Sequence, residues 1–181
     1  MVDRGRMWKI CRDGADDPAI SRSSPRAAAQ RVVVFDEDLC SLATDLLDTL
    51  RAASAIGITA THIGVLKRLA VIELAAADGV RIFVNPQIVW ASADMIRHEE
   101  GSVSMPGVTE EIERHARVRM SYQDLSGVEK IEEADGLLSV CLQHEVDQLD
   151  GIFWIYRLSR LKRDRVVKRF DKTQRTQASG D

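Results

Sequence analysis

The stretch from Gly136 to Gly151, GLLSVCLQHEVDQLDG, is the part of the sequence that decides the fold. Between its glycines it is apolar on nearly every side, which predicts a buried helix over 137–149. Its apolar residues are Leu137, Leu138, Val140, Cys141, Leu142, Val146 and Leu149. It also carries Gln143, His144, Glu145, Asp147 and Gln148. Because unpaired polar groups are costly to bury, this polarity is the strongest anomaly in the sequence.

His144 and Gln148 are four residues apart, so they share one face of the predicted helix, with Glu145 beside them. In the HExxH pattern of metal hydrolases, two histidines at this spacing hold the metal and the glutamate deprotonates its bound water. Here the letters are HEVDQ, because Gln148 stands where the second histidine would be. Two interpretations stay open: a metal site that is one ligand short, and a polar cluster that ties the helix to nearby backbone.

Outward from this helix, the pattern of the chain indicates an α+β domain. Acidic residues at 36–38 and an apolar stripe from Leu39 to Leu50 predict a helix over 37–53. Residues 57–64 read as a loop of small side chains. Asn85-Pro86 is expected to stop or bend the second of the predicted strands. Those strands lie at 69–74, 80–84, 118–122 and 128–133, with few helices between them, which is typical of the α+β class.

The chain is expected to divide into three parts. Residues 1–30 carry turn residues and little periodicity, which predicts an irregular arm. Residues 31–172 form the domain, including a basic C-terminal helix, and 173–181 form a tail. Between 157 and 175 there are nine Lys and Arg residues against two acidic ones, a net charge of +7.

Composition excludes several classes of protein. The 181 residues include 25 Lys and Arg and 28 Asp and Glu, a formal charge of −3, and 45% are hydrophobic. No apolar run approaches the ~20 residues that span a bilayer, which predicts no membrane segment. The near-neutral balance predicts no sequence-specific nucleic-acid binding. The three cysteines form no CxxC pair and no signal-peptide core is recognised, so reduced thiols and a cytoplasmic location are expected.

Three segments in this order resemble the motifs of peptide deformylase, which read roughly GxGxAAxQ, EGCLS and HExDH. They are Gly57-Ile-Thr-Ala-Thr-His62, Glu99-Glu-Gly-Ser-Val-Ser-Met-Pro-Gly107 and the region 133–151. The resemblance covers about residues 32–172 and includes Ile82–Pro86 and Tyr156–Lys162. It implies a small α+β hydrolase with antiparallel sheets around the buried helix that carries His144 and Glu145.

The resemblance also implies a reaction, in which formate is removed from the N-terminal formyl-methionine of nascent chains. In that family a cysteine and two histidines hold Fe(II) or Zn(II), and the glutamate is the general base and acid. The metal-ligand positions fall on Ser102, His144 and Gln148. The catalytic positions fall on Glu145 and on His62, which replaces the motif's glutamine. Substrate-binding positions fall on Gly57, Gly101 and Val103, whose N–H would help to stabilise the oxyanion.

These departures predict an impaired metal site. A serine hydroxyl is neutral near pH 7, and glutamine offers only an amide oxygen, so one good ligand of three remains. A bound metal lowers the pKa of water from about 15.7 to about 7. Without it, up to roughly 12 kcal/mol of activation is lost, at about 1.36 kcal/mol per pKa unit. We therefore expect no bound cofactor and little or no standard deformylase activity, with Fe(II) or Zn(II) present only if the family site still functions.

Two other hypotheses remain open. A rebuilt hydrolase site could hold a metal with His62, His144 and Glu145, or could use Ser102 as a nucleophile with a histidine base. A non-enzymatic protein could bind formyl-methionyl peptides or the ribosome. The resemblance implies ribosome docking through the basic C-terminal helix, which Val166, Val167 and Phe170 would pin to the domain.

Overall fold

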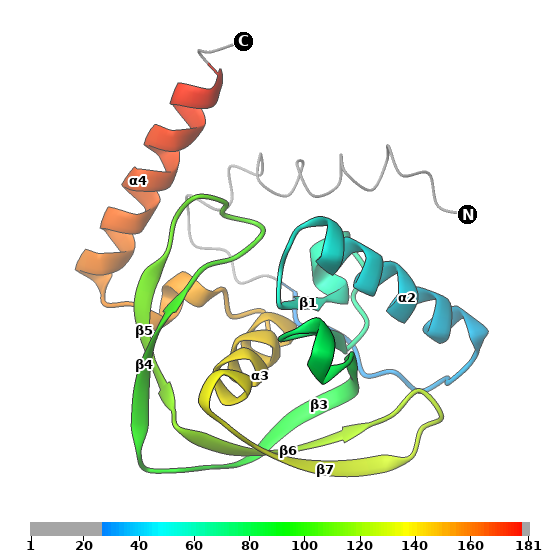
Figure 1. Cartoon of the computed structure of the whole chain (residues 1–181). Helices are drawn as coiled ribbons and strands as arrows, with labels where there is room; N and C mark the ends of the chain where they lie inside the picture. The colour runs from blue at the N-terminus through cyan, green and yellow to red at the C-terminus, as the bar shows by residue number, and fades with distance from the viewer. Residues whose placement is uncertain (1–26, 179–181) are drawn as a thin grey trace.

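The computed structural model describes residues 27–178, and the predicted arm at 1–30 therefore lies mostly outside the described residues. Its helix α3 (Gly136–Leu149) lies in the middle of the fold with antiparallel strands around it (Figure 1). Strands β3 (Arg81–Ala91), β6 (Arg117–Gln123) and β7 (Glu129–Asp135) run beneath α3. The predicted α+β architecture and the predicted buried helix are both confirmed.

The main sheet has five antiparallel strands in the order β1-β2-β3-β6-β7. Its first two strands are β1 (Gly57–Thr59) and β2 (Leu69–Ile72), and β1 contacts α3. The short helix η2 (Ala60–Ile63) follows β1 directly, and η3 (Ala76–Asp78) follows β2. The expectation of a loop over 57–64 is therefore wrong. A three-residue strand exists only because β2 pairs with it, and no local pattern reports such pairing.

Strand β3 does not stop at Asn85-Pro86 but bends there, which is the second of the two outcomes predicted. Asn85 has a φ of 53°, and the pairing register with β6 shifts between Val84 and Gln87, so the strand bends there. Asn85 is buried, and its side-chain amide bonds to both the N–H and the carbonyl of Val32, at 2.8 and 2.9 Å. It also donates to Gln123 at 2.7 Å, so this bend joins three distant parts of the chain.

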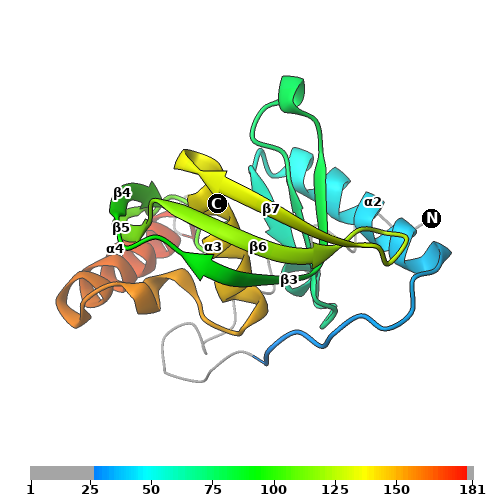
Figure 2. The ribbon, with the colours of Figure 1, turned by 90° about the horizontal axis from the view of Figure 1, so that it is seen from below.

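A second sheet consists of two strands that the sequence pattern did not predict, β4 (Met95–Glu100) and β5 (Glu110–His115). The loop between them, residues 101–109, carries Ser102. Seen from below, β4 and β5 lie beside the C-terminal helix α4 (Arg160–Ala178), at the end of the fold away from helix α2 (Glu37–Ala52) (Figure 2). The predicted boundary at 172 falls inside α4.

Three apolar clusters stabilise this arrangement. The helix α2 (Glu37–Ala52), capped by Asp36, packs on β1 and β2 with Leu39, Leu46 and Leu50 fully buried. The underside of α3 packs on the main sheet. The third cluster joins α4, the short helix η4 (Trp154–Arg157) and the 101–109 loop, and contains Val166 and Phe170 with Val167 against it. The predicted pinning of the basic helix is confirmed. No helix within 27–178 is long and apolar enough to cross a membrane.

Candidate functional site

A buried network of charges fixes the polar face of α3. Arg114 on β5 is 4% exposed and donates two hydrogen bonds to Glu100, at 2.7 and 2.9 Å. It donates a third to Asp147 on α3, at 2.5 Å. Arg157 on η4 also bonds Asp147, through Nε at 2.8 Å. Glu100 and Asp147 therefore each have an opposite charge beside them, which is the condition under which burial of charge is tolerated.

Glu100 in turn orients His144. The His144 Nδ1 lies 2.8 Å from Glu100 Oε2. Burial would raise the pKa of Glu100, but hydrogen bonds from Arg114 and His144 outweigh it and lower that pKa to about 2. Burial would lower the pKa of His144, but the hydrogen bond to ionised Glu100 leaves that pKa above its ordinary value. The ring of His144 is thus oriented by the hydrogen bond at Nδ1, and its other nitrogen, Nε2, does not take part in this bond.

Glu145, unlike Glu100 and Asp147, forms no ion pair with another described residue. It is 5% exposed, and among the described residues its Oε2 is buried with no hydrogen-bond partner. Burial raises its pKa to about 7. A Cβ at position 57 would collide with Glu145 Oε1, so Gly57 provides the space that this carboxylate occupies. An unpaired, buried carboxyl that titrates near neutrality can accept or release a proton from a bound ligand.

His62 and Gln148 lie against each other. Gln148 is buried, and its Nε2 lies 3.1 Å from His62 Nε2. On its other side the ring is held by Thr59, whose N–H donates to His62 Nδ1 at 3.1 Å. The catalytic position at 62 and the metal-ligand position at 148, both assigned by the resemblance, are therefore in contact as a hydrogen-bonded pair.

Ser102 lies in the loop between β4 and β5. Its hydroxyl accepts a hydrogen bond from the Ser104 N–H at 3.3 Å, and no histidine among the described residues bonds to it. This geometry gives no support to a serine nucleophile with a histidine base. Within the described range, the Val103 N–H donates to no protein acceptor, so it can donate to a ligand. A Cβ at Gly101 would lie 3.2 Å from the Val108 carbonyl, which fits a small residue at this turn.

The side chains at these positions do not fit a transition metal. Their donors are the Ser102 hydroxyl, the His144 imidazole and the Gln148 amide, and the last is already bonded to His62. In the part of the chain that the structure describes, no three His, Cys, Asp or Glu side chains gather to hold a metal ion. His62, His144 and Glu145 therefore do not form the three-ligand set of the rebuilt-site hypothesis.

Cys141 does not replace the missing thiolate. It is buried on α3 within the apolar cluster over the main sheet, as the sequence predicted. Burial, together with the negative charge of Glu145 and Glu100, raises the pKa of its thiol to about 12. At neutral pH it is therefore a packed, protonated thiol and not a ligand.

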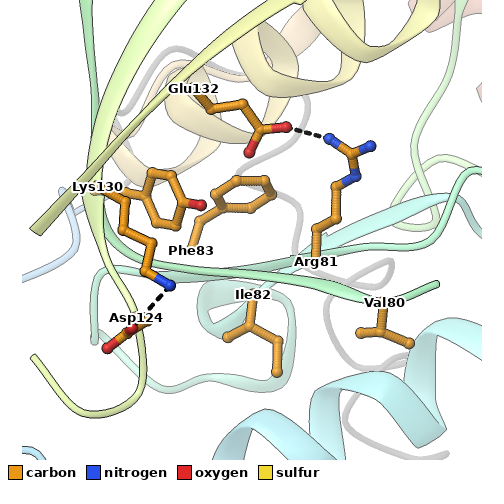
Figure 3. Close-up of a pocket in the computed structure, with 8 residues that line it drawn as sticks. Val80, Arg81, Ile82, Phe83, Asp124, Lys130 and Glu132 are labelled. Atoms are coloured by element: carbon orange, nitrogen blue, oxygen red, sulfur yellow. Dashed lines mark hydrogen bonds and ion pairs between the residues drawn. The ribbon is translucent and has the colours of Figure 1, made fainter. Parts of the chain in front are cut away.

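A separate surface pocket lies over β3, β6 and β7, with a volume of about 270 Å³ (Figure 3). Phe83 and Tyr122 meet edge to face in it, with ring centroids 4.8 Å apart. Its charged side chains are paired with each other, Arg81 with Glu132 and Lys130 with Asp124. None of the predicted site residues lines this pocket, and its charges leave no group unpartnered, so we place the candidate site at α3.

The sequence pattern did not predict that Arg114 and Arg157 belong to the site. Glu100 belongs to the second motif and Asp147 to the third, so both stood beside recognised positions. Arg114 lies in the charged run EEIERH and has no neighbouring motif that would single it out. Only its contacts with two carboxylates, 14 and 33 residues away along the chain, identify its role.

Comparison with known proteins agrees with the fold and with the motif resemblance. Residues 18–164 match the family model described as "Polypeptide deformylase". A "Peptide deformylase-like" protein of Brucella melitensis is 65% identical over 150 residues, 83% of this chain and 92% of that protein. The crystal structure of a peptide deformylase from Legionella pneumophila superposes with a TM-score of 0.78 and 37% identity, over 84% of this chain and 90% of that one.

Two further relatives come from one organism, Rhizobium meliloti (strain 1021). The first has the name "Peptide deformylase-like" and is 59% identical over 163 residues, 89% of this chain and 95% of that protein. The second has the name "Peptide deformylase" and is 40% identical over 157 residues, 85% of this chain and 90% of that protein.

Proposed function

This chain belongs to the peptide deformylase family, and we propose that it carries out little or no metal-dependent deformylation. The observation that supports this most directly is the contact between Gln148 and His62. It occupies one ligand position with an amide that already has a partner, while Ser102 occupies a second with a hydroxyl. A single imidazole, His144, remains of the family's ligand set.

Proton transfer by Glu145 does not compensate for a missing metal. Its pKa of about 7 suits a general base at neutral pH. Free water, however, has a pKa of about 15.7, against about 7 when a metal binds it. A base of this strength leaves water almost entirely un-ionised, so the nucleophile is absent even though the base is well placed.

The pair of relatives in Rhizobium meliloti also supports the proposal. That organism holds a protein named peptide deformylase beside one named peptide deformylase-like, and this chain shares more identity with the latter. Two such proteins in one organism fit a division in which one carries out deformylation and the other has a different task.

The test combines two measurements on untagged full-length protein. Elemental analysis is expected to find no stoichiometric iron, zinc, nickel or cobalt. Release of formate from a formyl-methionyl dipeptide is expected at a rate at least 10³-fold below that of the Rhizobium meliloti peptide deformylase at equal concentration. A stoichiometric transition metal together with comparable turnover would overturn the proposal.

We further propose that the site still binds formyl-methionyl peptides without cleaving them, in the cytoplasm, where nascent chains emerge from the ribosome. Two groups favour this role, namely Glu145 Oε2, which is buried without a hydrogen-bond partner among the described residues, and the Val103 N–H, which has no protein acceptor within 27–178. Titration calorimetry with a formyl-methionyl tripeptide is expected to detect binding, and the unformylated tripeptide is the control. Absence of heat at millimolar peptide would exclude this role.

A further inference from the structure

His62 and Gln148 are exchanged relative to the motifs of the peptide deformylase family. The first motif ends in glutamine where this chain has His62, and the third ends in histidine where it has Gln148. The side chains come from η2 and α3, 86 residues apart in sequence, and their nitrogens lie 3.1 Å apart. The two departures are therefore in direct contact, and each changes the surroundings of the other.

Local structure fixes the direction of the His62 ring. His62 is the third residue of η2 and forms a capping box with Thr59. The Thr59 N–H donates to Nδ1 at 3.1 Å, and the Thr59 hydroxyl lies 2.9 Å from the same nitrogen. Glutamine is one of the usual residues at this capping position, but it ends in a single amide group. Histidine caps η2 with Nδ1 and still reaches α3 with Nε2.

The same geometry decides where the proton of His62 lies. The Thr59 carbonyl oxygen also lies near Nδ1, at 3.3 Å, but the Thr59 N–H and hydroxyl are closer. We therefore assign Nδ1 as the acceptor, which places the proton of the neutral ring on Nε2. The Nε2–H then donates to the carboxamide of Gln148, whose oxygen and nitrogen can be turned to suit the bond. Metal binding needs an imidazole nitrogen with a lone pair, and in this arrangement His62 offers none toward α3.

We infer that the His62–Gln148 pair blocks the metal position. Even with the family's ligand residues restored at 102 and 148, a metal would bind weakly while His62 remains. An imidazole placed at 148 would meet the Nε2–H of His62 with the lone pair that a metal requires. The inference rests on the proposed function, since it explains why the chain lacks the metal, and it adds that His62 acts as a blocking residue.

Cobalt(II) titration of two matched variants tests this directly. Ser102→Cys/Gln148→His restores the ligand types and keeps His62, whereas His62→Gln/Ser102→Cys/Gln148→His also removes the blocking ring. We expect the second variant to bind cobalt at least tenfold more tightly, with a stronger thiolate-to-cobalt absorption band. Equal affinity would overturn the inference and leave the proposed function intact. Cobalt binding by the unaltered chain would count against the proposed function.

A stability cycle provides a readout that does not depend on metal, and it tests the coupling between His62 and Gln148 on which the inference depends. His62→Gln, Gln148→His and the double exchange are compared in urea with a chelator present. We expect each single exchange to raise the unfolding constant. The double exchange should give a constant at least fivefold smaller than the product of the single effects predicts. Additive effects would show that the two residues are not a coupled pair.

Discussion

At the scale of single residues, Glu145 decides what the site can do. The neighbouring carboxylates each have an arginine, whereas Glu145 is buried with Oε2 unpartnered among the described residues. A neutral side chain such as glutamine could occupy this position without the cost of burying a charge. A carboxyl kept there carries an energetic penalty whenever it ionises, and that penalty makes its role measurable.

The first prediction concerns the pH dependence of stability. The pKa of Glu145 rises from 4.5 to about 7 on folding, so the folded state binds more protons between these values. Its contribution to stability is therefore present below pH 4.5 and is lost as pH rises through 7. Glu145→Gln removes this loss. Urea titrations should show the variant gaining up to about 3 kcal/mol relative to the unaltered chain between pH 4.5 and 8, at ~1.4 kcal/mol per pKa unit. A difference that stays constant with pH would contradict the assignment.

The second prediction concerns the space that Gly57 leaves for this carboxylate. Gly57→Ala places a methyl group where Glu145 Oε1 lies, so the carboxylate must move. If the site binds formyl-methionyl peptides as proposed, affinity should fall about tenfold, while the urea midpoint changes little because a side-chain end can shift. Ala76→Gly, in the exposed short helix η3, is the control variant. Unchanged affinity in Gly57→Ala would separate Glu145 from the binding site.

At the scale of elements, the fold depends on how β5 is attached to α3. Arg114 bonds Glu100 at the end of β4 and Asp147 near the end of α3, and all three residues are buried. This one side chain therefore connects the small sheet to the central helix. Removal of this guanidinium leaves Glu100 with His144 alone and Asp147 with Arg157 alone, so both buried carboxylates lose part of their compensation.

The third prediction follows from this connection. Arg114→Met should destabilise the protein by about 3–5 kcal/mol, the usual effect of breaking a buried ion pair on one side only. Arg97→Met is the matched control on the same hairpin, because Arg97 is exposed and lies 3.5 Å from Glu113. Its effect should stay below about 1 kcal/mol. Chemical denaturation of both variants measures the difference, and similar losses would show that the Arg114 network is not stabilising.

Elements also show which parts of the fold the sequence could predict. Helices α2 and α3 were predictable because each has a local pattern, an apolar stripe in one and an apolar run closed by glycine in the other. Strands β4 and β5 read MIRHEE and EEIERH, and their charged faces carry no strand signal. The motif residues of the site could be found by resemblance. The contact of His62 with Gln148 could not, because it depends on tertiary packing of η2 against α3.

At the scale of the whole molecule, charge is separated along the chain. The net charge of −3 combines +7 over residues 157–175 with −10 over the rest. Helix α4 carries most of the positive part and packs against the domain through Val166 and Phe170. Deleting the chain beyond Leu161 would therefore remove core residues as well as charge, and could not separate the two effects.

The fourth prediction tests docking of α4 on the ribosome, which the family resemblance implies. Arg165, Lys168 and Lys172 are exposed on α4 and outside its apolar contacts. Changing all three to glutamate should abolish co-sedimentation with ribosomes at low salt while the thermal midpoint stays within a few degrees. Arg97, Arg117 and Arg119 changed to glutamate on the strands form a control of equal charge. If both triple variants lose co-sedimentation equally, binding depends on overall charge and not on this helix.

The bend at Asn85 has a consequence for the order of folding. Its side chain joins Val32 and Gln123, which are 53 and 38 residues away along the chain. Neither contact can form before the long intervening segments have closed on themselves, and closing long loops is what slows folding. The segment from 27 to 36 is held by similarly distant partners, because the Ala29 N–H donates to the Leu149 carbonyl at 2.7 Å and Gln30 forms a bridge with Lys67. We therefore expect the first residues of the domain to take their final place among the last.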